Sequence, residues 1–138
     1  CDDIARAHAM TGGIPYYLSF FSQWKCLDDA VMNEFFSPGG RLLVEPRLLL
    51  SMSFRNVDLY EGILDLMAHG CNEVSVIASK SGKDKAVVSQ ALAKLGQIGI
   101  AAKRKAIGGV GLERGWDIID GYFRFFYRFV FPYVPAIE

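Results

Sequence analysis

The most restrictive feature of the sequence is a run of short segments between residues 59 and 118 that glycines separate. Apolar residues recur at helical spacing in three successive segments, and Gly70 and Gly82 follow the first and the second of them. Two strand-like segments then flank the glycine-rich stretch 108–111. Three helices followed by a hairpin, with a tight turn between the second and third helices, predict a winged helix-turn-helix.

The third helix and the hairpin of this unit can be placed more closely. Asp84 has a side chain that commonly caps helices, so the third helix is expected to begin beside it. One apolar face of that helix would pack against the other two helices. The chain is expected to turn at 96–100 and to form strands at 101–107 and 114–118, with the glycine-rich stretch as the tip of the wing.

The first 53 residues predict an all-helical subdomain. Gly12-Gly13 should end a first helix, and Pro15 suits the first turn of a second helix that is apolar nearly all round. Such a helix is expected to be deeply packed. A third helix is expected over 27–36, and Pro46 is expected to break or to start a fourth.

The C-terminal segment is dominated by aromatic residues. Phenylalanine and tyrosine at helical spacing usually belong to a core. We therefore expect 122–134 to pack back on the helices of the first 53 residues, or to exchange with a second copy in a homodimer. The fold class is mainly α with one small β-hairpin, divided into 1–53, 54–118 and 119–138. The aromatic residues are Tyr122, Phe123, Phe125, Phe126, Tyr127 and Phe129.

Composition excludes several classes of protein. Hydrophobic residues make up 51% of the 138 residues, which argues against disorder. The three cysteines are far apart and form no CxxC pair, which predicts a reduced, cytoplasmic protein without a metal site. Arg124 and Arg128 interrupt the apolar stretch 123–134, so no membrane span is expected. We expect no nucleophile–base pair and no catalytic residue in this chain.

Positive charge is concentrated in one part of a chain whose formal net charge is zero. Between residues 80 and 114, eight basic residues stand against Asp84 and Glu113. In helix-turn-helix proteins the start of the second helix of the motif meets base edges, while wings contact phosphates. This pattern predicts DNA contact of low sequence specificity. The candidate DNA-binding residues are Lys83, Lys85, Ser89, Gln90, Lys103, Arg104, Lys105 and Arg114.

The same unit could instead be a protein–protein interaction or dimerisation module, because winged helices serve both purposes. A basic groove along Lys83, Lys85 and Lys103 would favour DNA. An exposed apolar surface at Val87 or Ile107 would favour a protein partner.

Three segments resemble one known family. Thr11-Gly-Gly-Ile-Pro-Tyr-Tyr-Leu18 resembles the GGxPxYL lid motif of the archaeal-type ATPases, in the AAA+/STAND group of P-loop NTPases. Residues 60–64 are similar to the helix that opens their winged helix. Residues 116–120 with 122–132 are similar to the stretch that enters their nuclease-like C-terminal domain, although Phe126 stands where the family usually has tryptophan.

The resemblance implies a helical lid followed by a winged helix, in a regulator that couples nucleotide state to DNA or partner binding. No GxxxxGK[ST] motif is present, so ATP and magnesium would be held by a P-loop domain of the intact parent. This fragment alone would form only half of the nucleotide pocket, so it is expected to bind nucleotide weakly or not at all. Gly13, Ile14 and Pro15 would lie close to the nucleotide in that parent.

Overall fold

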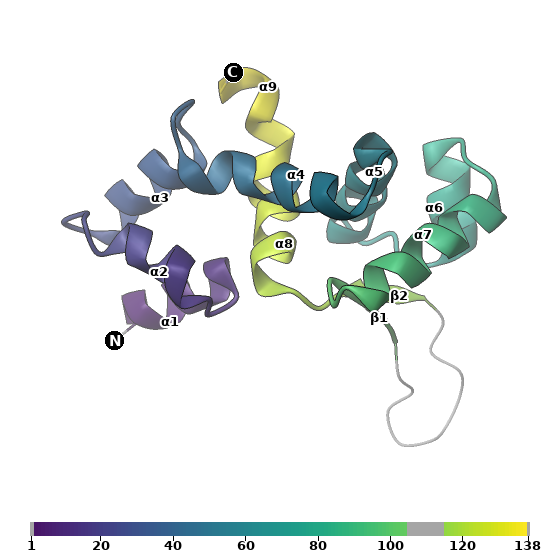
Figure 1. The fold of residues 1–138 in the computed structure, drawn as a ribbon, viewed down its shortest axis with the longest axis horizontal. Coiled ribbons are helices and arrows are strands. Elements are labelled where there is room, and N and C mark those ends of the chain that lie inside the picture. Colours follow the sequence, from purple (N-terminus) through teal and green to yellow (C-terminus); the bar gives the residue numbers. More distant parts are fainter. Residues whose placement is uncertain (1, 105–114, 138) are drawn as a thin grey trace. The chain divides into compact units, whose positions relative to one another are not determined.

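The computed structural model describes residues 2–104 and 115–137, which form two compact units (Figure 1). The first unit comprises Cys1–Val57 together with Gly121–Glu138, and the second comprises Asp58–Asp120. Helices dominate both units, and the second also holds a two-stranded antiparallel sheet. The predicted fold class is confirmed: it is mainly α, with a helical bundle, a winged helix-turn-helix and a C-terminal aromatic segment.

The helices of the first unit come from both ends of the chain. Helices α1 and α8 lie side by side although they are more than a hundred residues apart in the sequence (Figure 1). The elements are α1 (Asp2–Thr11), α2 (Pro15–Phe21), α3 (Leu27–Phe35), α4 (Arg41–Ser53), α8 (Gly121–Phe125), the π-helical turn η2 (Phe126–Val130), the 3-10 turn η3 (Phe131–Tyr133) and α9 (Val134–Ile137).

The corner between α1 and α2 follows the sequence prediction. Gly12 and Gly13 both have positive φ, 66° and 75°, and the Gly13 amide donates to the His8 carbonyl at 3.0 Å. Pro15 then starts α2. The expectation that α2 is deeply packed is wrong, because α2 lies at the surface of the unit. Its buried face carries Tyr17 and Phe20, whereas Tyr16 is 65% exposed.

Helix α4 does not break or start at Pro46, contrary to the prediction, but passes through it. Proline has no amide hydrogen, so the carbonyl of Leu42, four residues earlier, cannot receive its usual helical hydrogen bond. The hydroxyl of Tyr122 donates to that carbonyl instead, at 2.8 Å, in a buried position. A side chain from the C-terminal segment therefore satisfies the backbone group that the proline leaves open.

The aromatic segment packs on helices of the first unit, as predicted. The ring centroid of Tyr122 lies 4.8 Å from that of Tyr17, and those of Phe125 and Phe35 lie 5.0 Å apart. The segment is not one continuous α-helix, because the Phe131 amide reaches the Phe126 carbonyl and forms a π-helical turn. Exchange with a second copy, and a further domain beginning at 119–138, stay predictions.

A buried carboxylate joins the connection before α3 to the start of α4. Glu34 is 3% exposed and accepts hydrogen bonds from Trp24 Nε1 at 3.0 Å and from Arg41 Nε at 3.0 Å. It also accepts from Arg41 Nη2, and Arg41 lies over the Phe20 ring, 3.9 Å from its centroid. Burial alone raises the pKa of Glu34, but the hydrogen bonds from Arg41 and Trp24 outweigh it, so the pKa is lowered.

The second unit is the winged helix-turn-helix. Its sheet is antiparallel, with Ala101 opposite Ile118 and Lys103 opposite Trp116. The described parts of the strands are shorter than predicted, and residues 105–114, which include the expected wing tip, lie outside the described residues. The elements are α5 (Val57–Ala68), α6 (Val74–Ser81), α7 (Lys85–Gln97), β1 (Ala101–Lys103) and β2 (Trp116–Ile118).

The core of the second unit joins its three helices. Ile63 and Leu64 of α5, Ile77 of α6 and Leu92 of α7 are fully buried. In the described part of the chain, no helix is both long and apolar enough to cross a lipid bilayer.

Candidate nucleic-acid interface

The turn between α6 and α7 determines how the candidate residues are presented. Gly82 adopts the left-handed conformation, φ 71° and ψ 18°, and ends α6. Lys83 therefore lies in the turn, while Lys85 is the first residue of α7. Asp84 stands at the N-cap, but its side chain makes no capping hydrogen bond, contrary to the prediction. The Asp84 carboxylate is exposed, and only its backbone carbonyl contributes, by accepting from the Val88 amide at 3.1 Å.

Helix α7 separates buried apolar residues from exposed polar ones. Val88, Leu92 and Leu95 are fully buried on one face. Lys85 and Ser89, which are four residues apart, share the exposed side. Four candidate DNA-binding residues are exposed in the turn before α7 or in the first half of the helix: Lys83, Lys85, Ser89 and Gln90.

The surface of α7 is not uniformly polar. Val87 is 39% exposed, between the basic start of the helix and its polar middle. An exposed Val87 is the feature that favours a protein partner. Ile107, the other apolar residue whose exposure would favour a protein partner, lies outside the described residues.

The basic residues at the base of the wing differ in whether a carboxylate pairs with them. Lys103 is exposed, and its ammonium lies 5.7 Å from the centroid of the Trp116 ring. Arg104 Nε donates to both carboxylate oxygens of Asp117, each at 3.1 Å. This ion pair reduces the charge that Arg104 can offer to a phosphate. Lys105 and Arg114 lie outside the described residues.

Asn72, which the sequence reasoning missed, ties the wing to the loop between α5 and α6. Its Nδ2 donates to the Trp116 carbonyl at 2.7 Å and to Asp117 Oδ1 at 3.0 Å. The Trp116 amide donates in return to the Asn72 carbonyl at 2.8 Å. This close approach requires glycine at position 115, since a Cβ on Gly115 would lie 2.6 Å from the Asn72 carbonyl oxygen. The one sequence signal for this anchoring role is that Asn72 follows Gly70, the glycine that ends the preceding helix.

We expect Asn72→Ala to destabilise the base of the wing by about 1 to 2 kcal/mol, because a side-chain donor to two acceptors is lost. Amide hydrogen exchange at Trp116 is the measurement, and it should become faster by about tenfold. Asn33→Ala is the matched control, because the Asn33 side chain donates to one carbonyl in an exposed position of the first unit. Unchanged protection of Trp116 in Asn72→Ala would show that Asn72 does not anchor the wing.

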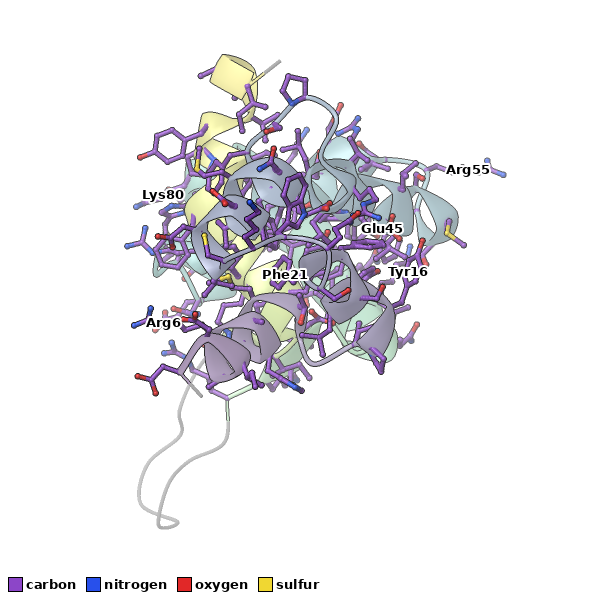
Figure 2. The ribbon with its side chains drawn as sticks, turned by 90° about the vertical axis from the view of Figure 1, so that its left-hand side faces the viewer. Arg6, Tyr16, Phe21, Glu45, Arg55 and Lys80 are labelled. Atoms are coloured by element: carbon purple, nitrogen blue, oxygen red, sulfur yellow. The ribbon has the colours of Figure 1, made fainter. Side chains whose placement is uncertain are left out.

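The motif that resembles the family's lid lies in the first unit, apart from these residues in the sequence. Ile14 and Pro15 are exposed, and Gly13 packs closely on His8, since a Cβ at Gly13 would lie 3.2 Å from His8 Nδ1. The Tyr17 hydroxyl donates to Glu45 Oε1 at 3.4 Å and so links α2 to α4; Figure 2 labels Glu45 and Tyr16, the residue before Tyr17. The corner at Gly13–Pro15 thus exposes Ile14 and Pro15 at the surface of the first unit.

Comparisons add no relative. No protein-family model, curated protein or solved structure matches the chain. Within residues 2–104 and 115–137, no three His, Cys, Asp or Glu side chains are placed so that they could hold a metal ion. The function has to be argued from the chain's own residues.

Proposed function

We propose that this chain is the lid and winged-helix region of a cytoplasmic, AAA+-like ATP-binding regulator, whose winged helix binds DNA. The observation that carries the DNA part is the exposed start of α7. There Lys83 of the turn and Lys85 and Ser89 of α7 are exposed, and Asp84 is the acidic residue among them. Two lysines and one short hydroxyl side chain favour phosphate contacts over base reading, so we expect low sequence specificity.

The lid part of the proposal is supported by the corner at Gly13–Pro15. This corner is exposed, as a surface that receives a nucleotide from another domain must be. In the intact parent, a P-loop domain would supply ATP and magnesium, and this chain contributes no catalytic residue.

A contact within the first unit suggests how nucleotide state could reach the winged helix. Gly121 directly follows Asp120, the last residue of the second unit. A Cβ on Gly121 would lie 3.0 Å from the Ala9 carbonyl oxygen and 3.4 Å from Gly12 Cα. A movement of the corner at Gly12 would therefore displace Gly121, the residue at which the chain leaves the winged helix and re-enters the first unit.

The experiment compares two double variants with the same change of charge. Lys83→Ala/Lys85→Ala should bind a labelled duplex of about 20 base pairs about tenfold more weakly at low salt, with a salt slope reduced by roughly 2. Lys25→Ala/Lys94→Ala should remain close to the wild type, because Lys25 lies in the first unit and Lys94 in the last turn of α7, and both are exposed. Fluorescence anisotropy at two salt concentrations measures both quantities.

Two outcomes contradict the DNA proposal. One is that the wild-type protein fails to bind the duplex even at low salt. The other is that the two double variants weaken binding equally, because the duplex would then respond to total charge and not to the start of α7.

The second candidate function is a protein-interaction or dimerisation module, and it has its own supporting observations. Val87 on α7 is 39% exposed, and Phe129 and Tyr133 of the aromatic segment are 54% and 60% exposed. Exposed aliphatic and aromatic side chains of this kind are typical of protein interfaces. A wild-type protein that ignores DNA but sediments as a dimer would favour this candidate.

A further inference from the structure

A cleft in the second unit lies between the start of α6 and the base of the wing. Its volume is about 390 Å3. The start of α6 provides Glu73, Val74 and Ser75, and the wing provides Lys103, Arg104, Gly115 and Trp116. The cleft is distinct from the start of α7, and only Lys103 and Arg104 of its lining were expected to contact DNA.

The start of α6 offers hydrogen-bond donors to this cleft. The first helical hydrogen bond runs from the Ile77 amide to the Glu73 carbonyl, so the amides of residues 74–76 have no partner within the helix. Glu73 stands at the N-cap, but its side chain makes no capping hydrogen bond. The Ser75 hydroxyl adds a further donor at the exposed lining. Uncapped amides beside a hydroxyl are suited to an anion.

Lys103 supplies positive charge to the same cleft. Its ammonium lies 5.7 Å from the Trp116 ring centroid. Among residues 2–104 and 115–137, no carboxylate forms an ion pair with it. Arg104 is held by Asp117, which does not line the cleft. The Lys103 ammonium can therefore face an incoming anion.

Trp116 gives the cleft a fixed wall. A Cβ on Gly96 would lie 3.2 Å from the Trp116 ring, so this ring packs closely on α7. The Trp116 backbone is held by Asn72 through hydrogen bonds of 2.7 and 2.8 Å. A rigid wall preorganises the lysine and the α6 amides for one ligand position.

We infer that this cleft binds one phosphate of the DNA backbone, with the α6 amides and Lys103 as donors, and that Glu73 weakens the contact. The inference rests on the proposed function. It follows from the docking of helix-turn-helix motifs, in which the first helix of the motif crosses the backbone while the second enters the major groove. Here α6 is that first helix, and its N-terminal end opens into the cleft. Glu73 places a carboxylate at the same lining, and like charges repel.

The test uses three single variants of the whole chain, each of which keeps the length of the side chain or nearly so. Lys103→Gln should lower the affinity for a duplex of about 20 base pairs about fivefold, and reduce the salt slope by roughly 1. Glu73→Gln should raise the affinity by about threefold, because a repulsive charge is removed. Lys94→Gln, in the last turn of α7, should change neither value. Circular dichroism of each variant checks that the helices are retained.

The outcomes separate this inference from the proposed function. If the wild-type protein binds no duplex, both are overturned. If it binds duplex and loses affinity in Lys83→Ala/Lys85→Ala, but Lys103→Gln and Glu73→Gln behave like Lys94→Gln, the DNA proposal stands and the cleft does not bind phosphate. If the two cleft variants alter binding of inorganic phosphate or ATP but not of duplex, a small phosphate ligand is the occupant and the inference is wrong.

Discussion

Glu34→Ala should lower the free energy of unfolding of the first unit by about 2 to 3 kcal/mol, since removal of one partner of a buried ion pair is strongly destabilising. The variant removes the acceptor of Trp24 Nε1 and the partner of Arg41 together. We place the loss below the largest known values because the Arg41 side chain is 46% exposed, so water can solvate it. Urea unfolding followed by Trp24 fluorescence measures the loss, in a Trp116→Phe background that leaves Trp24 as the one tryptophan.

The pH dependence of this stabilisation has a definite sign. The folded-state pKa of Glu34 is lowered, because the hydrogen bonds from Arg41 and Trp24 outweigh the effect of burial. The carboxylate therefore contributes its full stabilisation above the ordinary glutamate pKa of about 4.3, and loses it as the pH falls through the folded-state pKa. Glu34→Gln cannot titrate, so the stability gap between wild type and Glu34→Gln should be largest near neutral pH and shrink in acid.

A control isolates Glu34 from the other carboxylates. Asp28→Asn neutralises an exposed carboxylate in the first turn of α3. Its free energy of unfolding should stay close to that of the wild type at every pH. A constant gap between wild type and Glu34→Gln from neutral pH to pH ~3 would contradict the account, because the carboxylate would then make no charge-dependent contribution.

Tyr122→Phe should cost about 2 kcal/mol in the wild-type background, because it leaves the buried Leu42 carbonyl without a donor. In a Pro46→Ala background the same change should cost less than about 1 kcal/mol, since the new amide at position 46 can donate to Leu42 in the ordinary helical way. The two backgrounds form a double-mutant cycle, measured by urea unfolding.

The control for this cycle is Tyr133→Phe, which removes the hydroxyl of an exposed tyrosine in the same segment. It should change stability by less than about 0.5 kcal/mol in both backgrounds. Equal costs of Tyr122→Phe with and without Pro46 would mean that its hydroxyl does not replace the helical hydrogen bond that Pro46 removes.

Local signals in the sequence placed many element boundaries correctly. Gly12, Gly13 and Gly82 have the positive φ values that end helices, and Pro15 begins a helix where its missing amide hydrogen is harmless. These features depend on neighbouring residues alone, so a single sequence can reveal them.

Features that depend on distant residues could not be read in this way. The helix passes through Pro46, and Tyr122, far along the chain, donates to the Leu42 carbonyl that the proline leaves open. Arg104 is a candidate phosphate contact in the sequence, yet in the fold Asp117 of β2 forms an ion pair with it. The cleft beside Ser75 exists only because the wing returns next to α6. Each of these follows from tertiary contacts that no local pattern encodes.

The most direct test of the DNA proposal is a titration of the nitrogen-15-labelled chain with a duplex of about 20 base pairs, followed by amide chemical shifts at about 50 and 200 mM salt. We expect shift changes that cluster at residues 83–90 and at Lys103 and Arg104, and that shrink at the higher salt concentration. No shift changes at either concentration, or changes confined to the first unit, would contradict DNA binding by the winged helix.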